Sequence, residues 1–231
     1  MKKEYVNKIF ENIADKYDLM NDMMSFGLHK KWKNQFINHI DLNKSKNNIL
    51  DIGAGTGDIV SLIDKKYKSK INYTAYLVDP NTEMMNQGKI KVRNKNINWL
   101  ASYGEMLPFK KNMFDLVTMS FSLRNVENLG KTLKEINRVL KKNGQFLCLE
   151  FGKVDNLLIN TMYKFYSDNF IPKIGKRITG NEKAYQYLVE SIKRFPSQKN
   201  LVKILKKKNF NEISYHNLDF GIAVVYSCKK K

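Results

Sequence analysis

The chain has 231 residues, of which 42% are hydrophobic, and a formal net charge of +19. This length and composition suit one globular domain with a sizeable core. The longest apolar runs, such as residues 145–151, are far too short to cross a bilayer, and the start MKKEYVNKIF has no signal-peptide or transit-peptide character. Cys148 and Cys228 lack metal-ligand spacing, so we expect free thiols and no metal site. A cytoplasmic protein is the resulting expectation.

The positive charge raises the question of which partner the chain binds, if any. Nucleic acid is the first candidate for so basic a chain, but only five of the 41 basic residues are arginines and the lysines are scattered. A lysine- and asparagine-rich composition can reflect biased coding and then needs no partner. An anionic membrane surface is the functional alternative, because each nearby lysine contributes about 1 kcal/mol. RNA ranks third, and we expect no nucleic-acid partner.

The predicted elements begin with two helices and then alternate between strand and helix. Residues 4–17 and 28–40 carry apolar side chains at helical spacing. The following elements are predicted as strand 49–52, helix 58–67, strand 73–78, helix 82–93, strands 97–101 and 114–120, helix 131–140, a turn at 142–144, and strand 145–151. This alternation is typical of a doubly wound, mostly parallel α/β sheet.

The last third of the chain departs from that alternation. Residues 154–194 read as helical, are rich in tyrosine and phenylalanine, and are interrupted at Pro172 and Gly175, which favours a cap inserted over a substrate site. Ser197 is predicted to cap a helix that runs to residue 207. Two antiparallel strands at 212–216 and 222–226 should complete the sheet. The predicted organisation is one domain with N-terminal helices at 1–45, a sheet core at 46–152 and 197–231, and a cap at 153–196.

The stretch NILDIGAGTGD at residues 48–58 is the clearest sign of a cofactor site. Its glycines, Gly53, Gly55 and Gly57, follow GxGxG spacing, whereas dinucleotide-binding turns follow GxGxxG. Asp51 would repel a pyrophosphate but could engage, directly or through water, the ammonium of an amino-acid-like ligand. Asp79, at the end of the second strand, can accept both ribose hydroxyls, which fits NAD and S-adenosylmethionine (SAM) alike. Taken together these features favour SAM over an ordinary strand-to-helix turn.

Several longer motifs carry a family resemblance. The segment YDLMNDMMSFGLHKKW at 17–32 resembles the N-terminal signature of the ubiquinone/menaquinone biosynthesis C-methyltransferases. The similarity continues through ILDIGAGTGD, EMLPF at 105–109, SFSLRNV at 120–126, EINRVLKKNGQFLCLEF at 135–151 and AYQYLVESI at 184–192. The resemblance implies a Rossmann-like class I SAM-dependent methyltransferase, with a seven-stranded, mostly parallel sheet, a final antiparallel strand and a helical cap. It also implies that a methyl group is placed on a ring carbon of a polyprenylated benzoquinol or demethylmenaquinol.

Methylation of an aromatic carbon needs electron density there, which a phenolate supplies better than a neutral hydroxyl with a pKa of about 10. Arg124 follows the fourth strand, where a guanidinium could stabilise the oxyanion; a salt bridge to Glu127 or Glu150 is the structural alternative. Tyr17 and Asn125 are the other catalytic candidates that the motifs carry, with Tyr17 either bonding a quinol oxygen or packing in the core. His29 has the titration range of a proton acceptor, but a lone histidine before a helix is more often a cap or packing residue, so it is assigned no catalytic role.

The remaining site residues follow from the resemblance, position by position. The cofactor positions are Thr56, Asp79, Tyr103 with Gly104, and Ser120. Tyr103 stands where the family usually has asparagine or aspartate, so it cannot present the same short group to the adenine. Four cap aromatics are either core or a polyprenyl path: Tyr163, Phe165, Tyr166 and Phe170.

Two other functions and several partners stay open at this point. An RNA or protein methyltransferase would share the sheet, but SFSLRN stands where amino-group methylation commonly uses an acidic-Pro-Pro-aromatic tetrapeptide. A noncatalytic scaffold would not need to keep an intact LDIGAGTGD. A polyprenyl quinol is the expected substrate, with a homodimer and peripheral contact with an anionic membrane, at its inner face, or with other quinone-biosynthesis enzymes left open.

Overall fold

The computed structural model describes residues 21–22, 25, 27–42, 46–67, 71–154, 161 and 182–231. The predicted helix at 4–17, Tyr17, and most of the predicted cap, including its four aromatic candidates, lie outside the described residues. Within the described ranges, no helix combines the length and the apolar composition that a bilayer span requires.

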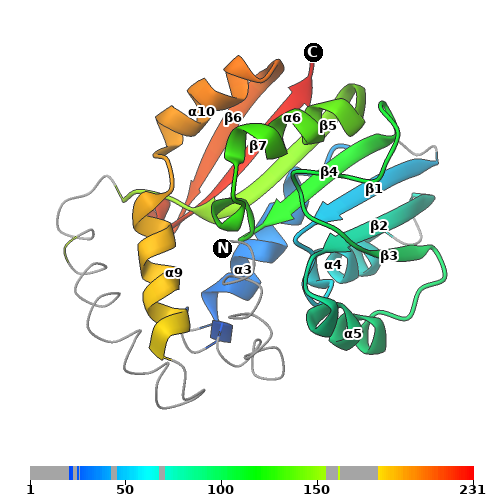
Figure 1. The fold of residues 1–231 in the computed structure, drawn as a ribbon, viewed down its shortest axis with the longest axis horizontal. Helices are drawn as coiled ribbons and strands as arrows, with labels where there is room; N and C mark the ends of the chain where they lie inside the picture. The colour runs from blue at the N-terminus through cyan, green and yellow to red at the C-terminus, as the bar shows by residue number, and fades with distance from the viewer. Residues whose placement is uncertain are drawn as a thin grey trace.

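A mixed sheet forms the centre of the described part of the chain (Figure 1). Its seven strands are β1 (Asn47–Ile52), β2 (Tyr73–Asp79), β3 (Ile97–Ala101), β4 (Phe114–Ser120), β5 (Leu140–Phe151), β6 (Phe210–Leu218) and β7 (Ala223–Lys230), in the order β3-β2-β1-β4-β5-β7-β6. Strands β1 to β5 pair in parallel, and β7 runs antiparallel to both β5 and β6. The predicted fold class is therefore confirmed.

Helices cover both faces of the sheet (Figure 1). The helical segments are α3 (Leu28–Phe36), η2 (Ile37–His39), α4 (Asp58–Tyr67), α5 (Thr82–Lys91), η3 (Leu123–Asn125), α6 (Leu129–Val139), α9 (Glu182–Arg194), α10 (Gln198–Lys207) and η4 (Asp219–Gly221). On one face, Leu133 of α6 and Leu201 of α10 join the same buried cluster. On the other, Trp32 of α3 and Ile63 of α4 do so. Because both faces are covered, central strands such as β1 are buried almost throughout.

Local sequence explains most helix boundaries. Asn81 precedes α5 and its Oδ1 accepts a hydrogen bond from the Met84 amide at 3.0 Å. Asn128 caps α6 in the same way, through Lys131 at 2.9 Å. Ser197 does stand at the start of α10 with an extended backbone, but its side chain makes no capping hydrogen bond.

Several predicted boundaries were wrong. The helix predicted at 28–40 ends at Phe36 and continues as a single 3-10 turn. The predicted turn at 142–144 lies inside β5, where the register against β4 shifts and Asn143 adopts a left-handed φ of 61°. The last two strands extend beyond the predicted 212–216 and 222–226, because their backbone pairing continues past the apolar residues that marked them.

The strand order indicates where a ligand site would lie. β1 lies between β2 and β4, so the chain crosses the sheet in opposite directions from this point. In open α/β sheets a ligand crevice opens outside the carboxyl ends of the strands at such a switch point. The loops that follow β1, β2 and β4 meet there.

Candidate active site

The glycine turn between β1 and α4 is held closely against the neighbouring strands. The Gly53 amide donates a hydrogen bond to the Val78 carbonyl at 2.7 Å. Gly53 has a left-handed φ of 67°, and a Cβ there would lie 2.4 Å from the Cβ of Ser122. A side chain at this position would therefore be strained and would collide with the loop after β4.

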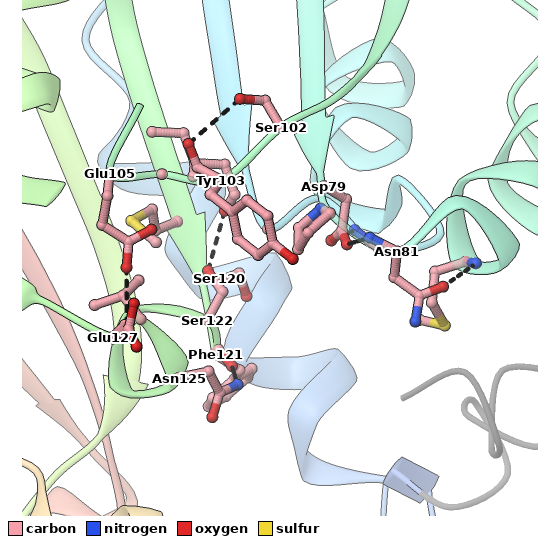
Figure 2. Close-up of a pocket in the computed structure, with 18 residues that line it drawn as sticks. Asp79, Asn81, Ser102, Tyr103, Glu105, Ser120, Phe121, Ser122, Asn125 and Glu127 are labelled. Carbon is pink, nitrogen blue, oxygen red and sulfur yellow. Dashed lines mark hydrogen bonds between the residues drawn. The ribbon is translucent and has the colours of Figure 1, made fainter. Parts of the chain in front are cut away.

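A first cavity, cavity 1, opens beside this turn, and its space of about 810 Å³ is partly open to solvent (Figure 2). It lies at the carboxyl ends of β1, β2, β3 and β4. Its polar walls come from loops far apart in sequence, and include Asp79, Asn81, Tyr103, Ser120, Asn125 and Glu127. A concave site with a few convergent polar groups is where a small molecule would bind.

Asp79 closes one end of cavity 1 and fixes the glycine turn. Its Oδ2 accepts a hydrogen bond from the Gly55 amide at 2.8 Å, and its Oδ1 accepts one from the Asn81 amide at 2.8 Å. Burial raises the pKa of Asp79 to about 6, although both hydrogen bonds favour the ionised form. A carboxylate held this way has a fixed direction and keeps lone pairs for hydroxyl groups of a ligand.

Tyr103 lies on the facing wall of cavity 1. Figure 2 shows its ring extending across the cavity towards Asp79, and the buried Gly104 follows it. The next residue, Glu105, is also buried and accepts hydrogen bonds from the amides of Glu127 at 2.8 Å and Asn128 at 3.3 Å. Glu105 therefore ties the loop after β3 to the loop before α6. Sequence reasoning had placed Glu105 in a motif without assigning it this role.

A second cavity, cavity 2, lies on the other side of the glycine turn, and its space of about 940 Å³ is partly open to solvent. α3 supplies His29, Trp32 and Lys33 to its wall, and α9 supplies Leu188 and Ile192. Cavities 1 and 2 share the lining residues Gly53, Gly55, Ser120 and Phe121. The two cavities therefore adjoin at the end of β4 and the glycine turn.

Asp51 belongs to cavity 2. Its Oδ1 accepts a hydrogen bond from the Thr118 hydroxyl at 2.7 Å, whereas its buried Oδ2 has no hydrogen-bond partner. Burial raises the pKa of Asp51 to about 7, against the opposing effect of Thr118. The buried hydroxyl oxygen of Ser120 also has no partner. Unsatisfied buried polar atoms are rare, and these two lie where a polar ligand would complete them. Thr56, also buried, donates its hydroxyl to Asp58 at 3.2 Å.

Arg124 lines cavity 2, with its side chain only 5% exposed. Its Nη1 donates to Glu150 Oε2 at 3.1 Å and to the Phe121 carbonyl, and the guanidinium carbon lies 5.2 Å from the centre of the Phe151 ring. Of the two alternative salt bridges considered from the sequence, the structure forms the one to Glu150. The buried Nε of Arg124 has no hydrogen-bond partner.

Asn125, the next residue, points to the other cavity. It lines cavity 1, its Oδ1 accepts a hydrogen bond from the Tyr187 hydroxyl at 3.3 Å, and its Nδ2 donates to the Phe121 carbonyl at 3.5 Å. The structure thus divides the two described catalytic candidates between adjoining cavities. The third, Tyr17, lies outside the described residues.

Sequence reasoning did not single out the charged pair that joins α3 to the glycine turn. Lys33 is buried, and its Nζ lies 2.6 Å from Oδ2 of Asp58, the first residue of α4. Burial would raise the pKa of Asp58, but Lys33 and the Thr56 hydrogen bond outweigh it and the pKa is lowered. The one indication in the sequence is the spacing: Lys33 follows His29 by four residues, so both side chains lie on one face of the helix.

Comparison with known proteins decides the family. A model of the ubiE/COQ5 methyltransferase family matches residues 1–230. The chain belongs to the ubiE/COQ5 methyltransferase family. A ubiquinone/menaquinone biosynthesis C-methyltransferase of Rickettsia bellii is 49% identical over 99% of this chain and 94% of its own length. The corresponding protein of Rickettsia prowazekii is 47% identical with the same coverage. The predicted family, and with it a SAM-dependent C-methyltransferase, is confirmed.

Solved structures confirm the fold independently of this family. A SAM-dependent methyltransferase of Thermotoga maritima superposes with a TM-score of 0.70 at 19% identity, covering 98% of this chain and 100% of that one. The [4+2]-cyclase SpnF superposes with a TM-score of 0.69 at 11% identity, covering 97% and 94%. At such low identity these similarities show the fold alone, which also serves other reactions.

The site of this ubiE/COQ5 family member fits SAM by its own chemistry. The unpartnered Oδ2 of Asp51 suits an ammonium group, and the oriented carboxylate of Asp79 suits two hydroxyls. All eight predicted cofactor positions line cavity 1 or cavity 2: Asp51, Gly53, Gly55, Thr56, Asp79, Tyr103, Gly104 and Ser120. Their individual contacts with the cofactor stay predictions.

Proposed function

We propose that the protein uses SAM to methylate a ring carbon of a polyprenylated quinol, either 2-polyprenyl-6-methoxy-1,4-benzoquinol or demethylmenaquinol, in quinone biosynthesis. The observation that carries this proposal is the pair of adjoining cavities in a chain of this family. One cavity would take the cofactor, and the other presents an arginine and several apolar side chains. Their shared wall at Ser120 and Phe121 is where donor and acceptor would meet.

Cavity 1 and the glycine turn would hold the cofactor. Asp79 would accept the ribose hydroxyls, and Tyr103 and Gly104 would flank the adenine. Asp51, on the cavity 2 side of the glycine turn, would bind the ammonium. Bound SAM supplies an electrophilic methyl group on a sulfonium whose departure needs no acid. The protein therefore contributes position, and a well-oriented pair of reactants can account for about 7 kcal/mol or more of rate enhancement.

Cavity 2 would hold the aromatic ring. Phe121, Phe151, Leu188 and Ile192 give it an apolar wall, which suits a quinol ring and the start of a prenyl chain. Arg124 would stabilise negative charge on a quinol oxygen, because its guanidinium lies in a buried site where electrostatic interactions are strong. Glu150 fixes the guanidinium in place and would be a positioning residue.

Methyl transfer from labelled SAM tests this function directly. Purified protein would be offered a short-chain demethylated benzoquinol, a demethylated naphthoquinol and bulk RNA in parallel, under reducing conditions. We expect label on a ring carbon of one or both quinols, and the preferred ring identifies the pathway. Label on RNA alone would overturn the proposal. SAM binding without transfer to either quinol would instead favour a scaffold within a quinone-synthesis complex.

We also propose peripheral contact with an anionic membrane, made by the turn that η4 forms. Phe220 is 73% exposed, and Asp219, Phe220 and Gly221 all have left-handed φ values, of 42°, 61° and 87°. A bulky residue in that conformation is strained, and strain of this kind collects at functional positions. The adjacent Ile222 lines cavity 2, so the turn lies at the edge of the cavity proposed for a lipid-soluble substrate.

Vesicle sedimentation tests the membrane contact. Phe220→Ser should weaken binding to vesicles that contain anionic phospholipid by about tenfold, since burial of a phenylalanine side chain contributes about 1.5–3 kcal/mol. Met106→Ser is the matched control, because Met106 is 71% exposed on a different loop. Equal effects of the two substitutions would contradict the proposal. A homodimer and contact with other quinone-biosynthesis enzymes stay predictions.

A further inference from the structure

His29 is a buried titratable group of cavity 2 to which the proposed function assigns no role. It is the second residue of α3, is 8% exposed, and lines the same cavity as Asp51 and Arg124. Arg124 itself cannot easily accept a proton, because a guanidinium stays charged in proteins and this one is committed to Glu150. A quinol hydroxyl in cavity 2 therefore needs another acceptor.

The hydrogen-bond network around Ser25 assigns the tautomer of His29. The Ser25 hydroxyl donates to the Asn21 carbonyl at 2.7 Å, which uses its single hydrogen. The same oxygen lies 3.2 Å from the His29 amide and 2.8 Å from His29 Nδ1, so it must accept from both. The neutral ring therefore carries its hydrogen on Nδ1, and Nε2 keeps its lone pair.

A route for the proton leads away from the cavity. Nε2 of His29 lies 3.8 Å from Oδ1 of Asp22, and that oxygen is buried without a hydrogen-bond partner. The other oxygen of Asp22 binds Lys30 at 2.7 Å, and the Asp22 side chain is 35% exposed. Asp22 can therefore stabilise an imidazolium that forms at His29 and pass the proton to solvent.

The charged groups around His29 keep it neutral in the resting protein. Burial lowers its pKa below the ordinary 6.5, Lys33 and Lys30 lower it further, and Asp22 and Asp58 act in the opposite direction. A neutral imidazole near pH 7 is the form that can accept a proton.

We propose that His29 is a catalytic proton acceptor, with Nε2 taking the hydroxyl proton of the aromatic substrate bound in cavity 2. This inference rests on the proposed function. The O–H bond breaks and its proton joins Nε2, while the ring oxygen, facing Arg124, carries the negative charge. The ring carbon then takes the methyl group as the bond between that group and the sulfonium sulfur of SAM breaks. The ring carbon loses its own hydrogen as a proton, the ring oxygen regains one, and a single proton is released to solvent overall.

Two measurements test the assignment, and the first needs no substrate. ¹⁵N NMR of labelled histidine should show the Nδ1-protonated tautomer at neutral pH, with His29 assigned by comparison with the variants below. The second is kcat between pH 5.5 and 8.5 at saturating SAM and quinol. The wild-type rate should rise with pH through the pKa of His29 and then level off.

His29→Asn is the decisive variant, because an asparagine can still donate to Ser25 but has no second nitrogen to accept a proton. We expect kcat to fall by about 10²-fold or more, the acid limb of the profile to disappear, and the Kd for SAM to stay within about twofold. His216→Asn, which removes an exposed imidazole from β6, should leave all three unchanged. If His29→Asn does not fold, His29→Gln replaces it.

The outcomes separate this inference from the function on which it rests. A folded His29→Asn protein with kcat within about threefold of wild type, or a ring protonated on Nε2 in the resting protein, would overturn the assignment alone. Wild-type protein that methylates neither quinol would overturn the proposed function and the assignment with it.

Discussion

The two cavities are built in different ways. In cavity 1 the key carboxylate, Asp79, receives both of its close hydrogen bonds from main-chain amides of the neighbouring turns. In cavity 2 the charged side chains instead form pairs that bridge distant parts of the chain: Lys33 with Asp58, and Arg124 with Glu150. Main-chain contacts persist through most substitutions, whereas each pair depends on two side chains.

This difference predicts how each cavity responds to mutation. Changes in cavity 1 should weaken SAM binding and leave the folded core nearly intact. Changes in the paired charges of cavity 2 should affect both turnover and folding, because one half of a buried pair is costly without the other. Measurements of SAM affinity, turnover and unfolding on the same variants would separate the two patterns.

The largest effect is expected at Arg124. In Arg124→Met the fully buried Glu150 loses its cation, so the free energy of unfolding should fall by about 3–5 kcal/mol. Turnover should fall by about 10²–10³-fold, as when an oxyanion-stabilising donor is removed. Denaturant unfolding and labelled-methyl transfer measure the two losses.

The double variant Arg124→Met with Glu150→Gln provides the control. It removes both charges, so much of the lost stability should return while turnover stays low. A double variant that regains turnover would show that Arg124 serves folding alone. Arg194→Gln breaks an exposed pair with Glu190 and should cost at most about 1 kcal/mol.

Asp79→Asn should show the pattern of cavity 1. The amide keeps one acceptor oxygen but turns a donor towards a main-chain amide, so SAM should bind about 10²-fold more weakly. kcat at saturating SAM should change little. Calorimetric titration measures the affinity, and Glu83→Gln, which removes an exposed charge from the first turn of α5, is the control. Unchanged affinity in Asp79→Asn would refute the ribose contact.

The sequence predicted cavity 1 better than cavity 2 for a physical reason. The turn at Gly53 and the strand end at Asp79 are each local features, and a parallel sheet brings its carboxyl strand ends to one edge. The same rule placed Tyr103 and Ser120. Helices and strands at 58–67, 97–101 and 114–120 were predicted to the residue, because apolar periodicity and flanking polar residues mark them.

Cavity 2 depends on contacts that no local pattern contains. The pair of Lys33 and Asp58 spans 25 residues, and the pair of Arg124 and Glu150 spans 26. A salt bridge to Glu150 was one of two alternatives, and only the packing of η3 against β5 selects it. His29 was set aside because a lone histidine before a helix is more often a cap or packing residue, and its contact with Ser25 is visible only in the structure.

The pH dependence of SAM binding sharpens the comparison at Asp51, which lines cavity 2 just before the shared glycine turn. Burial raises the pKa of Asp51 to about 7, so in the free protein this carboxyl is largely protonated below pH 7. An ammonium ligand favours the ionised form, so binding must release a proton there, and affinity should fall by about tenfold from pH 8 to pH 6. Asp51→Asn should bind more weakly at pH 8 and show a flat profile. A sloping profile in that variant would assign the titration to another group.

The smallest effect on SAM binding and turnover is expected for a change at Tyr73, at the opposite end of β2 from Asp79. Tyr73, at the amino end of β2, donates its hydroxyl to Asp64 at 2.6 Å, and Asn94 donates to the same oxygen at 2.8 Å. Tyr73→Phe keeps the buried ring and leaves Asn94 in place, so the cost should be about 1–2 kcal/mol and Tm should fall by about 2–8 °C. SAM affinity and kcat should not change, because Tyr73 lines neither cavity. A loss of SAM affinity in Tyr73→Phe would mean that strain in β2 reaches Asp79, and the site would then depend on the whole strand as well as on its carboxyl end.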